Sequence, residues 1–338
     1  MNKYIKKIII VASLVLALTA CQADEVDQEK PNDDTQIEDQ INEEQEAVAK
    51  DFDELIASET NLEEIKNFID ENIDKADSDT ADKMILELVE LQKGAQEEAI
   101  NKFSGENSAN IQDQINKAYE KAKSEFDKGY IFTGSSKYTL IDNIEDKNVA
   151  KDIEELFNKG YGLISGEGTY YPIIDYTMME EDYSDNLGDM TSDYIDIMAT
   201  ELDEPTTVEE HLAIDIDELK DRVLEYEDFM KDYKGSPYVE DVKMPYMICV
   251  WKIVNPTAFD KMLNEDLSPS DELKELYESI LEDDSYPASQ EAVKGITEFI
   301  NSKEGVVGSP DNMDDFYKAS ANIHKQVEEK VAELYLGE

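Results

Sequence analysis

The sequence predicts an all-α fold: a helical bundle or an array of helical hairpins, with one Gly-rich loop or short hairpin around residues 160–172. Three observations lead to this prediction. Apolar residues recur at intervals of three and four along most of the chain. Capping motifs precede several of these stretches. Strand-like and helix-like segments do not alternate as they do in a βαβ protein.

The charge of the chain excludes some classes of function. Acidic residues outnumber basic ones by 82 to 31, and the net charge is −51. Nucleic-acid binding needs clustered Lys and Arg to displace counterions, so we expect no nucleic-acid partner. The chain has only two His and two Cys, which argues against metal and nucleophile chemistry that needs several of these side chains. No cofactor is expected, with calcium as the one alternative.

The first 20 residues differ in composition from the rest. Lys3, Lys6 and Lys7 precede an apolar run over residues 8–18, and the segment contains no acid. This is the pattern of a secretory signal peptide. The run is too short for the ~20 residues of a transmembrane helix.

Residues 18–21, Leu-Thr-Ala-Cys, resemble the lipobox of bacterial lipoproteins. The resemblance implies that residues 1–20 are removed and that Cys21 is lipidated, with diacylglycerol and palmitate-type chains. The mature protein, with a charge of −54, would then be held at the outer, extracellular face of the cell membrane. The alternative is an ordinary signal peptide cut after Ala20. With Cys21 acylated, only Cys249 remains, and its apolar neighbours indicate a buried thiol.

Two helical regions are expected after an acidic, disordered tether at residues 21–44, which has too few apolar residues to fold. The first is a helical module at 45–128. Its helices begin after a capping box at 60–63, near Asp79, and near Asn110. The second is a larger helical domain at 129–338. Its expected helices are 148–157, 191–202, 215–233, 238–254, 270–281, 289–301 and 311–336.

A Tyr-x-x-Ser turn occurs twice in the larger domain, at 233–236 and 286–289. These turns look like those of tetratricopeptide-like hairpins, in which an aromatic residue closes one helix and Ser caps the next. A repeat array and a generic bundle both remain open. Arg222, the only Arg, lies between Glu218 and Glu225 on a predicted helix and is interpreted as a structural hub.

The Gly-rich stretch offers the main candidate site. Glu167 lies between two glycines and is followed by Tyr170, Tyr171, Asp175 and Tyr176. One acid among aromatic rings is typical of a site that stacks sugars or peptides, with Glu167 as a candidate catalytic acid. The alternative is a loop whose tyrosines close the core beneath it.

The remaining candidates are metal sites. Asp182, Asp185 and Asp189 belong to a stretch with oxygen ligands at alternate positions, which suits calcium; the alternative is an Asx-rich turn leading into a helix. His211 and His324 lack the paired-His pattern of helical zinc peptidases and are interpreted as structural or exposed.

The chain from residue 148 onward resembles an uncharacterised group of extracellular lipoproteins from low-GC Gram-positive bacteria. The resemblance rests on residues 160–168, 174–176, 199–202 and 215–233. It implies an extracellular location and a helical fold, and it supplies no catalytic residues. The leading hypothesis is a non-enzymatic binding or scaffold protein that holds an envelope protein or wall polymer through its C-terminal domain. The alternatives are a wall glycan or peptide hydrolase that uses Glu167, and the solute-binding lipoprotein of a transporter.

Overall fold

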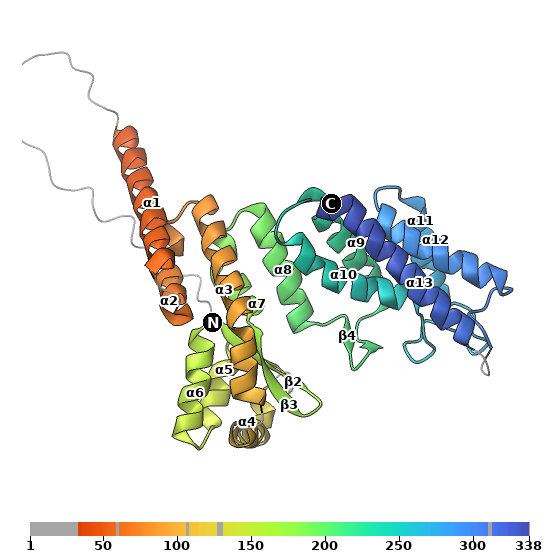
Figure 1. The fold of residues 1–338 in the computed structure, drawn as a ribbon, viewed down its shortest axis with the longest axis horizontal. Helices are drawn as coiled ribbons and strands as arrows, with labels where there is room; N and C mark the ends of the chain where they lie inside the picture. The colour runs from red at the N-terminus through yellow and green to blue at the C-terminus, as the bar shows by residue number, and fades with distance from the viewer. Residues whose placement is uncertain (1–32, 59–60, 106–107, 127–130, 310–312, 338) are drawn as a thin grey trace, which may run out of the picture. The chain divides into compact units, whose positions relative to one another are not determined.

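The computed structural model describes residues 33–58, 61–105, 108–126, 131–309 and 313–337 (Figure 1). Over these residues the chain is mainly helical with small antiparallel sheets, which confirms the all-α prediction. None of the described helices is long and apolar enough to cross a membrane. The helices are α1 (Asp33–Ser58), α2 (Leu62–Asn72), α3 (Ser78–Ser104), α4 (Ala109–Ala122), α5 (Ser136–Asn143), α6 (Lys147–Asn158), α7 (Tyr176–Tyr183), α8 (Asp189–Asp203), α9 (Ile216–Asp232), α10 (Val239–Val254), α11 (Asp271–Glu282), α12 (Pro287–Ser302) and α13 (Asp314–Val331). The strands are β1 (Ile131–Phe132), β2 (Tyr161–Gly166), β3 (Thr169–Ile174), β4 (Thr207–Val208) and β5 (His211–Leu212).

The chain divides into two units between Glu43 and Glu44. The described part of the first unit is the beginning of α1, so residues 33–44 are helical where a disordered tether was expected. The reason is that helix nucleation is the costly step, and a helix formed over 45–58 extends through polar residues at little further cost. The predicted signal segment, Cys21 and the rest of the expected tether lie outside the described residues.

At two of the predicted helix starts, residues 215 and 270, the first side chain caps the helix. The carboxylate of Asp215 accepts a hydrogen bond from the Glu218 amide at 2.8 Å at the start of α9. The Ser270 hydroxyl accepts one from the Leu273 amide at 3.2 Å at the start of α11. At α2 the capping side chain is Asn61, the second residue of the expected box.

The Gly-rich stretch is a β-hairpin, one of the two conformations that the sequence left open. Strands β1, β2 and β3 form an antiparallel sheet in that order, and β2 and β3 pair from Tyr161 with Ile174 to Gly166 with Thr169. The turn contains only Glu167 and Gly168, whose φ angles are 51° and 79°. Positive φ at both central residues is what a two-residue type I′ turn requires.

Packing is continuous across residue 129, where a domain boundary was expected. Helix α3 packs against β3, and α4 packs against α5 and β3. The Phe132 ring of β1 lies 5.0 Å from the Phe126 ring and 5.4 Å from the Tyr170 ring. Residues 44–338 therefore form one compact unit and not the two regions that the sequence suggested.

The C-terminal part of this unit is an array of helices centred on α10. Helix α10 packs against α8, α9, α12 and α13, and α12 packs along α13 (Figure 1). A Cβ atom on Gly295 of α12 would lie 2.9 Å from Cγ1 of Ile323 on α13. The glycine therefore permits the close approach of these two helices.

The Tyr-x-x-Ser turns do not work as predicted. Tyr233 does end α9, but α10 begins after Tyr238, and Ser236 does not cap it. Ser289 lies inside α12 and not before it. The prediction that these serines cap the next helix is wrong, because a residue pattern does not specify which hydroxyl faces a free backbone amide.

Ser289 is instead bonded to the buried carboxylate of Glu227 on α9. One Glu227 oxygen accepts from the Ala288 amide at 2.8 Å and the Tyr335 hydroxyl at 2.7 Å. The other accepts from the Ser289 amide at 2.9 Å, the Ser289 hydroxyl at 2.5 Å and the Tyr246 hydroxyl at 3.4 Å. The carboxylate thus joins the first turn of α12 to three other segments, in the position that favours an anion at a helix N-terminus.

Arg222 is buried and acts as a hub, as expected. Its Nε donates to Glu218 at 2.8 Å, and its Nη1 donates to Glu201 of α8 at 3.1 Å and to the Glu204 carbonyl at 2.6 Å. These bonds join α8 to α9.

Candidate functional site

The residues of the Gly-rich candidate site point in different directions. Glu167 is exposed on the two-residue turn of the hairpin. Tyr171 is exposed on β3, whereas Tyr170 is buried against Phe132. Since side chains alternate between the two faces of a strand, neighbouring tyrosines cannot share one binding surface.

Asp175 and Tyr176 serve the core. Asp175 is fully buried, forms an ion pair with Lys137 at 2.6 Å, and accepts from the Met178 amide at 3.1 Å as the N-cap of α7. The buried hydroxyls of Tyr176 and Tyr194 are hydrogen-bonded at 3.0 Å. The structure therefore brings neither residue to the exposed Glu167.

The calcium candidates are spread over three short segments. Asp182 is on α7, Asp185 follows it in a single 3₁₀ turn, and Asp189 begins α8; all three are exposed. Among the residues that the structure describes, no group of three or more His, Cys, Asp or Glu side chains is arranged to hold a metal ion.

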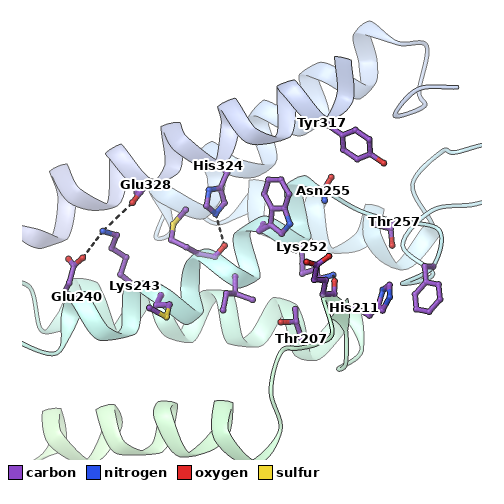
Figure 2. Close-up of a pocket in the computed structure, with 16 residues that line it drawn as sticks. Thr207, His211, Glu240, Lys243, Lys252, Asn255, Thr257, Tyr317, His324 and Glu328 are labelled. Atoms are coloured by element: carbon purple, nitrogen blue, oxygen red, sulfur yellow. Dashed lines mark hydrogen bonds and ion pairs between the residues drawn. The ribbon is translucent and has the colours of Figure 1, made fainter. Parts of the chain in front are cut away.

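A groove of about 910 Å³ lies elsewhere, in the C-terminal helical array. Helix α10 forms its floor, α13 one wall, and the β4–β5 hairpin with residues 255–259 the other (Figure 2). Both His residues and the single Trp of the chain line this groove. Its lining residues are Thr207, Glu210, His211, Glu240, Lys243, Met244, Met247, Ile248, Trp251, Lys252, Asn255, Thr257, Phe259, Tyr317, His324 and Glu328.

The floor is one continuous face of α10. The lining positions 240, 243, 244, 247, 248, 251, 252 and 255 follow the spacing of three and four that places residues on one side of a helix. The middle of this face is apolar, and Met244 is 71% exposed and Ile248 36%. Trp251 lies partly exposed beyond them.

Helix α13 supplies the first wall. His324 Nε2 lies 3.1 Å from the Met247 carbonyl oxygen, and the His324 ring meets the Trp251 ring edge to face at 5.5 Å. Tyr317 stands two turns earlier on α13 and is 53% exposed. The wall therefore continues the aromatic surface of the floor.

The second wall is fastened by a buried ion pair. Lys252 Nζ lies 3.0 Å from Asp260 and also donates to the Glu210 carbonyl. Asp260 accepts from the Leu212 amide of β5 at 3.1 Å. Burial alone would raise the pKa of Asp260, but the bonds from Lys252 and Leu212 outweigh it and lower that pKa.

The top of this wall is aromatic. The His211 ring packs against the Phe259 ring with their centroids 3.9 Å apart, and Phe259 is 72% exposed. His211 Nδ1 lies 3.6 Å from the same Asp260 carboxylate.

Charged side chains stand at the other end of the groove. Figure 2 shows Lys243 of α10 between Glu240 and Glu328, at 3.0 Å and 3.7 Å. With exposed Glu210 on the hairpin, the rim has more acidic than basic side chains, since Lys252 is buried against Asp260.

The sequence interpretation missed this groove and treated His211 and His324 as structural or exposed. One signal was present: residues 239–254 are apolar on more than the single stripe that a surface helix needs. The walls carried no such signal, because His324 is 77 residues away in sequence from Met247, whose carbonyl oxygen it contacts.

Comparison of the chain with models of protein families, with curated proteins and with solved structures found no match.

Proposed function

We propose that the protein is a lipid-anchored extracellular binding protein of the cell envelope, and that the groove on α10 holds part of its partner. The observation that carries this proposal is the exposed apolar face of α10 between two walls. Exposed apolar patches with a polar rim are typical of interaction sites. The partner is a component of the envelope, either a protein or a wall polymer.

The anchor rests on the sequence alone. Residues 1–20 have the composition of a signal peptide, and Cys21 occupies the lipidated position of a lipobox. We expect Cys21→Ala to release the protein from membranes into the medium. Unchanged membrane retention of this variant, followed by fractionation, would contradict the anchor.

The groove is tested by site-specific photo-crosslinking in intact cells. A photoreactive amino acid at position 244 should give a defined adduct with one envelope component. The matched control is position 138 on α5, because Tyr138 is 70% exposed and Met244 71%. Identical adducts at both positions, or none at position 244, would count against the groove as the binding site.

A hydrolase that uses Glu167 has less support. Acid–base hydrolysis of glycans needs two carboxyl groups held at a fixed separation. An exposed side chain on a hairpin turn is poorly suited to that role. Loss of a wall-degrading activity in Glu167→Gln would revive this alternative, and uptake of a small solute that depends on the protein would favour the transporter alternative.

A further inference from the structure

The middle of helix α10, residues 244–251, has the residue pattern of a helix that is covered on all sides. Val242, Tyr246 and Val250 are buried in the array on its inner faces. Met244 and Ile248 extend the apolar surface onto the face that lines the groove. Helices that are apolar all round are normally buried, so this open face fits a further helix.

The shape of the groove suits a helix of a defined length. The lining face runs from residue 240 to residue 255, which at 1.5 Å per residue is about 22 Å, or four turns. Helices α10 and α13 bond their backbone groups internally and offer few of them to an extended segment. The backbone groups of a bound helix are already hydrogen-bonded within that helix. Its binding therefore needs only side-chain packing, as in helix-in-groove recognition.

The charge of the protein indicates the charge of the occupant. Glu210, Glu240 and Glu328 stand at the rim, and Lys243 is already paired with two of them. The whole chain has a net charge of −51, which attracts a cationic partner and repels an acidic one at long range. A wall glycan fits the floor less well, because the Met244, Met247 and Ile248 side chains offer sugar hydroxyls at most the weak acceptor of a thioether sulfur.

We propose that the groove binds a cationic amphipathic helix of about four turns, carried by a partner protein, with its apolar face on α10 and its Lys or Arg residues at the rim. The proposal rests on the proposed function and names the partner class. The anchoring side chains of the bound helix follow the spacing of three and four that α10 itself presents.

The single Trp makes a direct test available, because excitation selective for Trp reports only on Trp251 in the groove. The probe is a synthetic peptide of about 15 residues with Leu spaced three and four apart and Lys on the opposite face. One control replaces Lys by Glu, and another has the same composition with Leu and Lys alternating. A soluble oligomer of N-acetylglucosamine represents the wall glycan.

The Lys peptide should change Trp251 fluorescence saturably, and its affinity for the protein should fall as salt is added. The Glu peptide and the alternating peptide should each bind at least about tenfold more weakly, since they lose the charge match and the apolar face respectively. The Met244→Asp variant should also bind the Lys peptide about tenfold more weakly, because binding would bury an unpaired carboxylate against the peptide. Tyr138→Asp is the matched control and should bind as the parent does.

Three results would overturn the proposal in distinguishable ways. Saturable binding of the glycan with none of the Lys peptide would assign the groove to a wall polymer and leave the proposed binding function standing. Binding to Met244→Asp that is as tight as binding to Tyr138→Asp would mean that the peptide is held by general charge and not by the groove. Absence of any response, together with no adduct from position 244, would remove the proposed function as well.

Discussion

The buried carboxylate of Glu227 gives the sharpest prediction about stability. It accepts five hydrogen bonds, from the Ala288 and Ser289 amides and from the hydroxyls of Ser289, Tyr335 and Tyr246. Glu227→Gln keeps the size of the side chain and replaces one acceptor oxygen by an NH₂ group. The two backbone amides cannot turn away, so at least one of them loses its acceptor.

The expected cost follows from these contacts. A buried amide without an acceptor costs about 1–3 kcal/mol, and each remaining bond to a neutral acceptor is about 1 kcal/mol weaker than a bond to a carboxylate. Neutralising a buried charge recovers part of its desolvation free energy. We therefore expect Glu227→Gln to lower the free energy of unfolding by about 2–4 kcal/mol.

Urea unfolding followed by Trp251 fluorescence measures this loss, because Trp251 lies on α10 at the centre of the C-terminal array. Tyr335→Phe removes one donor and should cost about 1 kcal/mol. Glu291→Gln, at an exposed position of α12, should stay within about 0.5 kcal/mol of the parent. A loss below 1 kcal/mol in Glu227→Gln, or an equal loss in Glu291→Gln, would refute the reasoning.

Three further predictions concern other buried contacts. Asp260→Ala leaves Lys252 buried without its partner and should cost about 3–5 kcal/mol in urea unfolding. Since the pKa of Asp260 is lowered from 3.8, this difference should be complete above pH 3.8 and shrink as the pH falls below it; a constant difference would contradict the ion pair. Burial raises the pKa of the Cys249 thiol to about 12, so a thiol reagent at pH 8 should modify it only in the unfolded protein, and rapid reaction of the folded protein would count against its burial. Gly295→Val should cost about 2–3 kcal/mol by thermal unfolding through its clash with Ile323, and Ile323→Ala should relieve part of that cost; simple additivity of the two changes would exclude the contact.

The helices were largely predictable because their signals are local. An apolar residue every three or four positions and a capping side chain fix both the extent and the start of α9 and α11, where Asp215 and Ser270 bond to amides three residues ahead. The start of α1 was not predictable in this way. Its first turns carry only two apolar residues, Ile37 and Ile41, whose helical spacing was too weak a signal against the acidic composition, and they are helical by extension from residues 45–58.

The hairpin and the groove depend on contacts that a local pattern does not contain. Glu167 and Gly168 form a turn that usually begins with Asn or Asp, so the sequence left a loop and a hairpin equally open. In the groove, His324, Trp251 and His211 come from three separate segments. Each residue is unremarkable in its own neighbourhood, and only the packing of α13 and the β4–β5 hairpin beside α10 brings them together.

The two walls of the groove differ in how they are held, and this bears on exchange kinetics. Helix α13 packs along both α10 and α12, whereas the β4–β5 hairpin is tied to the array by Asp260 and Lys252. Segments with few packed contacts open locally at a lower free energy than the core does. If the groove holds a partner, the hairpin is the expected exit route, and weakening the Lys252–Asp260 ion pair should shorten the lifetime of the complex with little effect on how fast it forms.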